Sequence, residues 1–138
     1  MNSESKADLK RSIIAMLLRL QASDNSGHMQ EFAYIHKVAA HLGLSEEDVV
    51  SVEAALHKYP LHPPSDEKER MTILYYLLFL MDIDGAITEE EQQLVEHFGM
   101  LLGFRIAMTA EMVSVVKSYK SRKLPPEALL GQIKKYLN

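Results

Sequence analysis

Apolar residues recur every three or four positions along most of the chain, which is the spacing of one face of an α-helix. Two such stripes are Leu9, Ile13, Met16, Leu17 and Leu20, and then Phe32, Ile35, Val38, Ala39 and Leu42. No stretch alternates apolar and polar residues with the period of two that is typical of a strand. The pattern therefore predicts an all-α protein.

Residues that start and stop helices divide this pattern into segments. Gly43 and Gly103 follow the last apolar residue of a stripe, where glycine commonly ends a helix. Ser45 is a good N-cap, and Thr88 with Glu91 has the spacing of a capping box. We expect a single compact bundle of about seven helices, which cover 5–21, 28–42, 45–58, 65–81, 88–102, 106–120 and a last segment from Pro125.

The chain resembles itself when its second half is laid over its first. Residues 11–43 align with 71–103 without a gap, and eight of the 33 pairs are identical. Leucine-rich helices inflate such matches, but the pairs Asp24/Asp84 and Glu31/Glu91 are polar and lie at the connection between two apolar helices. We interpret the chain as an internal pseudo-two-fold repeat, roughly 11–60 and 71–120.

Length, composition and charge exclude several classes of protein for this chain. The 138 residues predict one domain, 1–138, and the absence of Cys excludes disulfides and Cys-ligated metals. The start lacks a signal peptide, and the longest apolar run, Met71 to Met81, is too short for a membrane span, so we expect a cytoplasmic protein with no membrane insertion.

The net charge of −4 disfavours nucleic acid as a binding partner, although residues 117–138 carry +5. This basic tail is interpreted as a solvated helix face or as docked on the acidic part of the chain.

The residues from Met81 to Glu91 form the most site-like feature. Five carboxylates, including Asp82, Asp84 and Glu91, fall within ten residues, and Gly85 permits a tight turn. Oxygen-rich loops of this kind suit hard divalent cations of the Ca²⁺ or Mg²⁺ class. The segment is similar to the end of an EF-hand loop, but Leu80 would stand at the first ligand position, so an EF-hand is disfavoured.

Two interpretations of this acidic loop remain open. Asp, Gly, Thr and Glu in this order make a turn and a helix cap without any ligand. Alternatively, Asp24 and Glu31 of the first half join Asp82, Asp84 and Glu91 around one divalent cation, if the two loops lie side by side.

The segments 82–91 and 22–31, with the helix ends at Gly103 and Gly43, resemble the bacterial TerB-like family (tellurite-resistance TerB and the N-terminal domain of the co-chaperone DjlA). The resemblance covers roughly residues 10–120. It implies an all-helical domain associated with tellurite and other stress resistance, whose acidic loop residues are proposed to bind metal. Asn25 in place of Gly85 and Ala22 opposite Asp82 leave the first half with fewer ligands.

We therefore expect a non-catalytic binding module with an unidentified protein partner. The alternative is a metal-independent protein-interaction domain whose acidic loop is only turn and cap. A third possibility is a hydrolase that uses the clustered carboxylates, which would need a deep pocket beside them. No histidine spacing typical of zinc, no nucleophile elbow and no glycine-rich phosphate loop occurs in the chain.

Overall fold

Helices form all of the regular structure in the part of the chain that the computed structural model describes, which is residues 3–23, 29–83 and 87–119. The elements are α1 (Ser3–Ala22), α2 (Met29–His41), α3 (Glu46–Ala54), the short 3-10 helix η1 (Leu56–Lys58), α4 (Glu67–Asp82), α5 (Glu89–Leu101) and α6 (Ile106–Tyr119). The predicted all-α class is confirmed. Six α-helices are described against about seven expected, and the segment from Pro125 lies outside the described residues.

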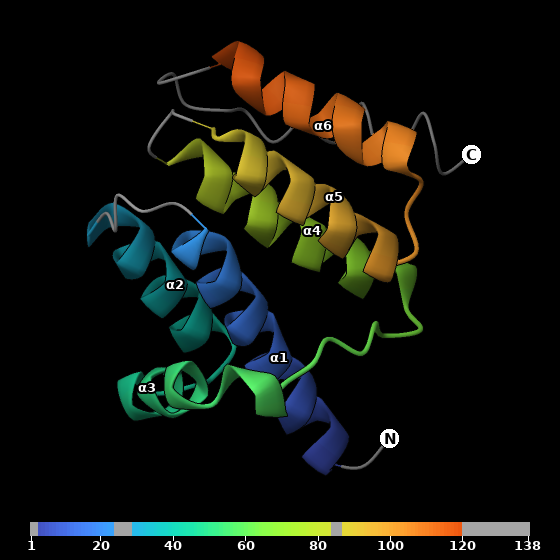
Figure 1. The fold of residues 1–138 in the computed structure, drawn as a ribbon. Helices are drawn as coiled ribbons and strands as arrows, with labels where there is room; N and C mark the ends of the chain where they lie inside the picture. Colours follow the sequence, from blue (N-terminus) through green and yellow to red (C-terminus); the bar gives the residue numbers. More distant parts are fainter. Residues whose placement is uncertain (1–2, 24–28, 84–86, 120–138) are drawn as a thin grey trace.

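The helices α1 and α4 form the centre of the molecule and pack against each other. On one side, α2 and α3 cover α1, and on the other side α5 and α6 cover α4 (Figure 1). Both central helices contribute fully buried side chains to the core: Ile14, Met16, Leu17 and Leu20 from α1, and Leu74, Leu77, Leu78 and Met81 from α4. Within the described ranges, no helix is both long and apolar enough to cross a bilayer.

Most helix ends lie where the sequence signals place them. Ser45 caps α3, with its side chain accepting a hydrogen bond from the N–H of Asp48 at 3.1 Å. Gly43 and Gly103 follow α2 and α5 with φ of 81° and 90°, a left-handed conformation that glycine adopts without strain. The chain reversal after each helix therefore depends on these two glycines.

Three details differ from the expected pattern. The predicted helix 45–58 ends early, because Ala55 leaves helical geometry and Arg19 Nη2 donates a hydrogen bond to the carbonyl oxygen of Leu56 at 2.7 Å. Phe32 belongs to the apolar stripe of its segment but lies at its edge, 36% exposed. Met100 has a spacing in the sequence that suggests a core residue, but it is 49% exposed because it lies on the face of α5 opposite the buried Val95 and Phe98.

Several helix ends and turns of residues 71–119 match those of residues 11–59, although α1 begins earlier than α4 in this alignment and α6 is longer than α3. The helices α1 and α4 end at Ala22 and Asp82, and α2 and α5 span 29–41 and 89–101. The turns that follow are also alike: the N–H of Leu44 donates to the carbonyl of Ala39 at 2.8 Å, and that of Phe104 to Gly99 at 2.9 Å. The same local geometry therefore occurs twice in the chain.

Candidate functional site

The acidic segment of the second half lies at the junction of α4 and α5. Asp82 is the last residue of α4, and Thr88 is the N-cap of α5. The Thr88 side chain accepts a hydrogen bond from the N–H of Glu91 at 3.0 Å, and Glu91 Oε1 accepts one from the N–H of Thr88 at 3.1 Å. This capping box satisfies two backbone groups at the positive end of α5. It also turns the Glu91 carboxylate towards the protein, where it is 3% exposed.

The corresponding carboxylate of the first half is Glu31. It is the third residue of α2, as Glu91 is the third residue of α5, and it is 2% exposed. Burying a carboxylate is costly unless hydrogen bonds or a helix N-terminus stabilise its charge. Both helices begin on the same side of the molecule, where α1 and α4 end (Figure 1). The fold therefore holds two buried glutamates at one end of the bundle.

The structure describes three of the five predicted metal ligands. These are Glu31, Asp82 and Glu91, whereas Asp24 and Asp84 lie outside the described residues. Among 3–23, 29–83 and 87–119, no three His, Asp or Glu side chains form a group that could hold a metal ion. A cation site in these loops thus depends on Asp24 and Asp84 and stays a prediction. Leu80 is buried in the core at 2% exposure, so the first EF-hand position offers no ligand.

Among the described residues, no histidine joins the acidic side chains in a group that could hold a metal ion. His36 stacks on Phe32 with ring centroids 5.6 Å apart, and His97 packs at a tilt against Phe98 at 6.1 Å. His41, His57 and His62 are exposed. These contacts are those of surface histidines resting on neighbouring aromatic rings.

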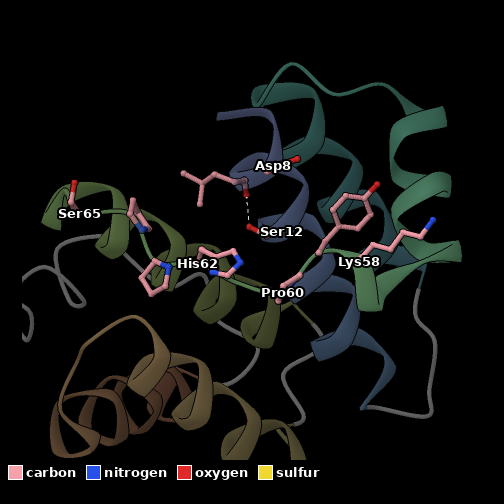
Figure 2. A pocket seen from close by; sticks show the side chains of 10 residues that line it. Asp8, Ser12, Lys58, Pro60, His62 and Ser65 are labelled. Atoms are coloured by element: carbon pink, nitrogen blue, oxygen red, sulfur yellow. Dashed lines mark hydrogen bonds between the residues drawn. The ribbon is translucent and has the colours of Figure 1, made fainter. Parts of the chain in front are cut away.

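A first cavity, here named the linker cavity, lies between α1 and the segment that joins the two halves. Its volume is 630 Å³, which is typical of small-molecule sites. Figure 2 shows Lys58 and Ser65 at its two ends, with Pro60 and His62 between them and Ser12 of α1 behind. Ser12 is buried, and its hydroxyl donates a hydrogen bond to the carbonyl of Leu9 at 2.7 Å, drawn as the dashed line. Its lining residues are Asp8, Leu9, Ser12, Lys58, Tyr59, Pro60, His62, Pro63, Pro64 and Ser65.

A second cavity, here named the interhelical cavity, lies between the central helices α1 and α4 and the end of α2. It has a volume of about 500 Å³. Ile13 and Ile73 are its most deeply buried side chains, at 5% and 2% exposure. Its lining residues are Leu9, Lys10, Ile13, Leu42, Lys68, Glu69, Thr72, Ile73 and Tyr76. It therefore combines an apolar interior with charged residues from two neighbouring helices.

Two tyrosines connect α2 with α4 beside this cavity. The Tyr34 hydroxyl donates a hydrogen bond to the carbonyl oxygen of Tyr76 at 3.2 Å. Burial raises the pKa of the Tyr34 hydroxyl, and nearby Tyr76 adds to this rise. Burial also raises the pKa of the Tyr76 hydroxyl. Both side chains thus remain neutral hydrogen-bond donors at physiological pH.

The basic part of the chain is represented among the described residues by Lys117 of α6. Its Nζ donates a hydrogen bond to Gln92 Oε1, and Gln92 Nε2 donates to Glu96 Oε1 at 3.2 Å. These residues line a polar groove of about 510 Å³ with Glu89 and Gln93. Lys117 therefore contacts the polar face of α5 that carries Glu89 and Glu96, and the docking of the rest of the basic tail stays a prediction. The lysines and the arginine from residue 120 onwards lie outside the described residues.

The sequence alone did not reveal either cavity. None of the linker cavity, the interhelical cavity and the polar groove is lined by Asp82 or Glu91, so none is the deep pocket that the hydrolase hypothesis requires. The three prolines at 60, 63 and 64 are the one signal that could have marked the linker cavity, because proline restricts how closely a segment can follow a helix surface. The interhelical cavity leaves no such signal in the sequence.

Comparison with known proteins adds no relative: no protein-family model, no curated protein and no solved structure matches the chain. The resemblance to the TerB-like family therefore rests on the residues of the two loops and on the helix ends at Gly43 and Gly103.

Proposed function

We propose that this chain is a non-catalytic, TerB-like binding module whose binding surface is the end of the bundle that carries the two acidic loops. Its ligand there is a divalent cation of the Ca²⁺ or Mg²⁺ class, which orders the loops for a protein partner in a stress response. One observation carries the proposal: Glu31 and Glu91, at equivalent positions of the two halves, are both buried, at 2% and 3% exposure.

The repetition supports a shared role for these carboxylates. Each glutamate is the third residue of its helix, and each follows an aspartate, Asp24 or Asp84, at the same spacing. We propose that the halves 11–60 and 71–120 are related repeats, because the ends of α1 and α4, both bounds of α2 and α5 and the turns that follow them also agree in this alignment. Two buried carboxylates at equivalent positions provide negative charge and oxygen ligands of the type that Ca²⁺ and Mg²⁺ prefer.

The capping box at α5 favours a second candidate, a metal-independent interaction domain. Glu91 Oε1 already accepts the Thr88 N–H, so the side chain has a structural role without any ligand. In this alternative the partner contacts the exposed apolar residues at the start of α2, where Met29 is 87% exposed and Phe32 lies one turn further on. The loops then act only as rigid turns that present this surface.

Thermal unfolding in EDTA and then in Ca²⁺, Mg²⁺, Mn²⁺ or Zn²⁺ separates the two candidates. A cation at 100 times its dissociation constant stabilises the native state by about 2.7 kcal/mol. For a domain of this length, that raises Tm by several degrees. We expect Asp84→Asn and Glu91→Gln to abolish this rise, because each removes a negatively charged ligand.

The choice of glutamine at position 91 makes the test specific. Gln keeps an oxygen that accepts the Thr88 N–H, so the cap survives while the charge is lost. Thr88→Ala is the matched control: it weakens the cap by about 1 kcal/mol in EDTA and leaves the response to the cation unchanged. If no cation at millimolar concentration changes Tm of the wild type, the cation proposal is wrong and the metal-independent candidate remains.

A further inference from the structure

The interhelical cavity has the two zones of an amphipathic binding site. Its interior is formed by the aliphatic side chains of Leu9, Ile13, Leu42 and Ile73. Ile13 and Ile73 come from α1 and α4 and lie at equivalent positions of the two halves, so the cavity sits between the halves. Sites between the helices of a bundle commonly bury the apolar part of a ligand in this way.

The mouth of this cavity is positively charged within an acidic protein. Lys10 of α1 and Lys68 of α4 both line it, with one carboxylate, Glu69, beside them. The lining therefore carries +1, whereas the chain as a whole carries −4. No ion pair or hydrogen bond joins these three charged side chains to any residue in the described part of the chain. Tyr76 adds a neutral hydroxyl donor to the same lining.

We propose that the interhelical cavity binds a monomeric amphipathic anion, a medium-chain carboxylate. The alkyl chain lies against Leu9, Ile13 and Ile73, and the carboxylate lies at the mouth between Lys10 and Lys68. This site is distinct from the acidic loops, because none of its lining residues belongs to either loop. Its occupation is therefore independent of the cation proposed above.

Charge and volume together favour this ligand class over others. A cationic amphiphile would meet two ammonium groups and one carboxylate, and a purely apolar molecule would leave the net positive charge of the lining uncompensated. A cavity of about 500 Å³ limits the ligand to one chain of moderate length. The linker cavity lacks this arrangement, since one lysine, one aspartate and one histidine share its lining with three prolines.

Titration of the full chain with hexanoate, octanoate and decanoate, followed by methyl NMR, tests the proposal. Each added methylene is expected to lower Kd about fourfold until the interior is filled. The methyl signals of Leu9, Ile13, Leu42 and Ile73 are expected to shift together and to saturate below the micelle concentration. Decyltrimethylammonium, which has the same chain length and the opposite charge, is expected to bind at least about tenfold more weakly than decanoate.

Charge variants at the mouth give a second, independent measurement. We expect Lys10→Gln and Lys68→Gln each to raise Kd for decanoate about two- to fivefold, and Glu69→Gln to lower it by a similar factor. Lys58 lines the linker cavity, so Lys58→Gln is the matched control and is expected to leave Kd for decanoate unchanged. Thr72→Leu fills the cavity from an exposed position of α4, so it is expected to abolish binding while the fold is retained.

Three results would overturn this assignment. They are the absence of saturable binding of decanoate, equal binding of decyltrimethylammonium, and a loss of affinity in Lys58→Gln as large as in Lys10→Gln. Glu69 is exposed, so Glu69→Gln is expected to fold normally. Its predicted effect is tighter binding of decanoate, which a loss of folding could not produce.

Discussion

The inner faces of α1 and α4 agree closely when the two halves are aligned, whereas the outer faces of α2 and α5 do not. Ile13, Leu17 and Leu20 correspond to Ile73, Leu77 and Leu80, and all six are buried. In contrast, the outer face of α2 exposes Met29 and Phe32, where α5 has Glu89 and Gln92. Side chains that share one core are restricted in volume and polarity, while exposed positions are not. The two halves therefore differ most at their exposed positions.

The halves also differ in how their first and third helices meet. In the first half, Arg11 Nη2 of α1 lies 3.4 Å from Asp48 Oδ1 of α3. The residues at the equivalent positions of α4 and α6 are Met71 and Met108. The aligned positions thus carry a charged pair in one half and two methionines in the other. Stability in the first half should consequently depend on pH at this position, and in the second half it should not.

The largest expected effect tests the equivalence of the inner faces. Leu17 and Leu77 are both fully buried. Leu17→Ala and Leu77→Ala each leave a cavity in the core, so each is expected to lower the free energy of unfolding by about 3 kcal/mol. Denaturant unfolding of both variants measures these losses. The comparison between the halves fails if one loss is more than about twice the other, and Val50→Ala, at 64% exposure, is the surface control.

A smaller effect concerns the contact between α5 and α6. A Cβ added at Gly99 would lie 2.5 Å from Thr109 Oγ1, and Thr109 is fully buried. Ala39 and Val49 occupy the equivalent positions of the first half, so there the smaller residue carries a Cβ atom. Gly99→Ala is expected to destabilise the protein by about 1–2 kcal/mol through overpacking, despite the better helix propensity of alanine.

The double variant Gly99→Ala/Thr109→Ala shows whether this contact is the cause. Removing the Thr109 side-chain atoms makes room for the new methyl group, so the loss in the double variant should be smaller than the sum of the two single losses. Thermal or denaturant unfolding of all four proteins completes the cycle. Additive losses would mean that the contact does not limit the approach of α5 to α6.

The smallest expected effect is the pH dependence of α3. Hydrogen bonds from the backbone and hydroxyl of Ser45 lower the pKa of Asp48 below its usual value, and Arg11 contributes less. A lowered folded-state pKa stabilises the protein above the unfolded value of about 4, and this stabilisation is lost as the pH falls through the folded-state pKa. Hydrogen exchange of α3 amides should therefore show easier opening below about pH 4.

Asp48→Asn is the control for this prediction. Asparagine keeps a side-chain acceptor for Ser45 but carries no charge, so the pH dependence of α3 should become flat. In α6 the position that aligns with Asp48 is Met108, which does not titrate. The α6 amides should therefore show no easier opening at low pH, in the wild type or in Asp48→Asn. Equal acid sensitivity of α3 and α6 in the wild type would contradict the difference between the halves.

Local signals predicted the helices well because their causes are local. Ser45, Thr88 and Glu91 satisfy backbone groups one turn away, and Gly43 and Gly103 adopt a conformation set by the absence of a Cβ atom. The break at Ala55 was not predictable in this way, since it coincides with a hydrogen bond to Leu56 from Arg19, which lies far away in the sequence. Met100 was wrongly expected in the core, because it lies on the face of α5 opposite the buried Val95 and Phe98.

The candidate sites also combine features that local sequence predicts with features that depend on packing. The position of Glu91 in a capping box followed from the spacing to Thr88, but its burial depends on how α5 packs in the bundle. The interhelical cavity depends on the gap between α1 and α4, which meet only in the folded protein. Lys10 and Lys68 are ordinary helix residues in the sequence, and only the packing of the two helices brings them to one mouth.

The linker between η1 and α4 has a consequence for how the two halves find each other. The linker makes the association of the two halves an intramolecular event at a high effective concentration. Its three prolines keep the linker extended and stiff. A cut between Leu61 and His62 would leave two fragments whose central helices, α1 and α4, each lose their partner. Reassembly of these fragments would then depend on protein concentration, so a single peptide bond decides whether this bundle behaves as one chain or as a dissociable pair.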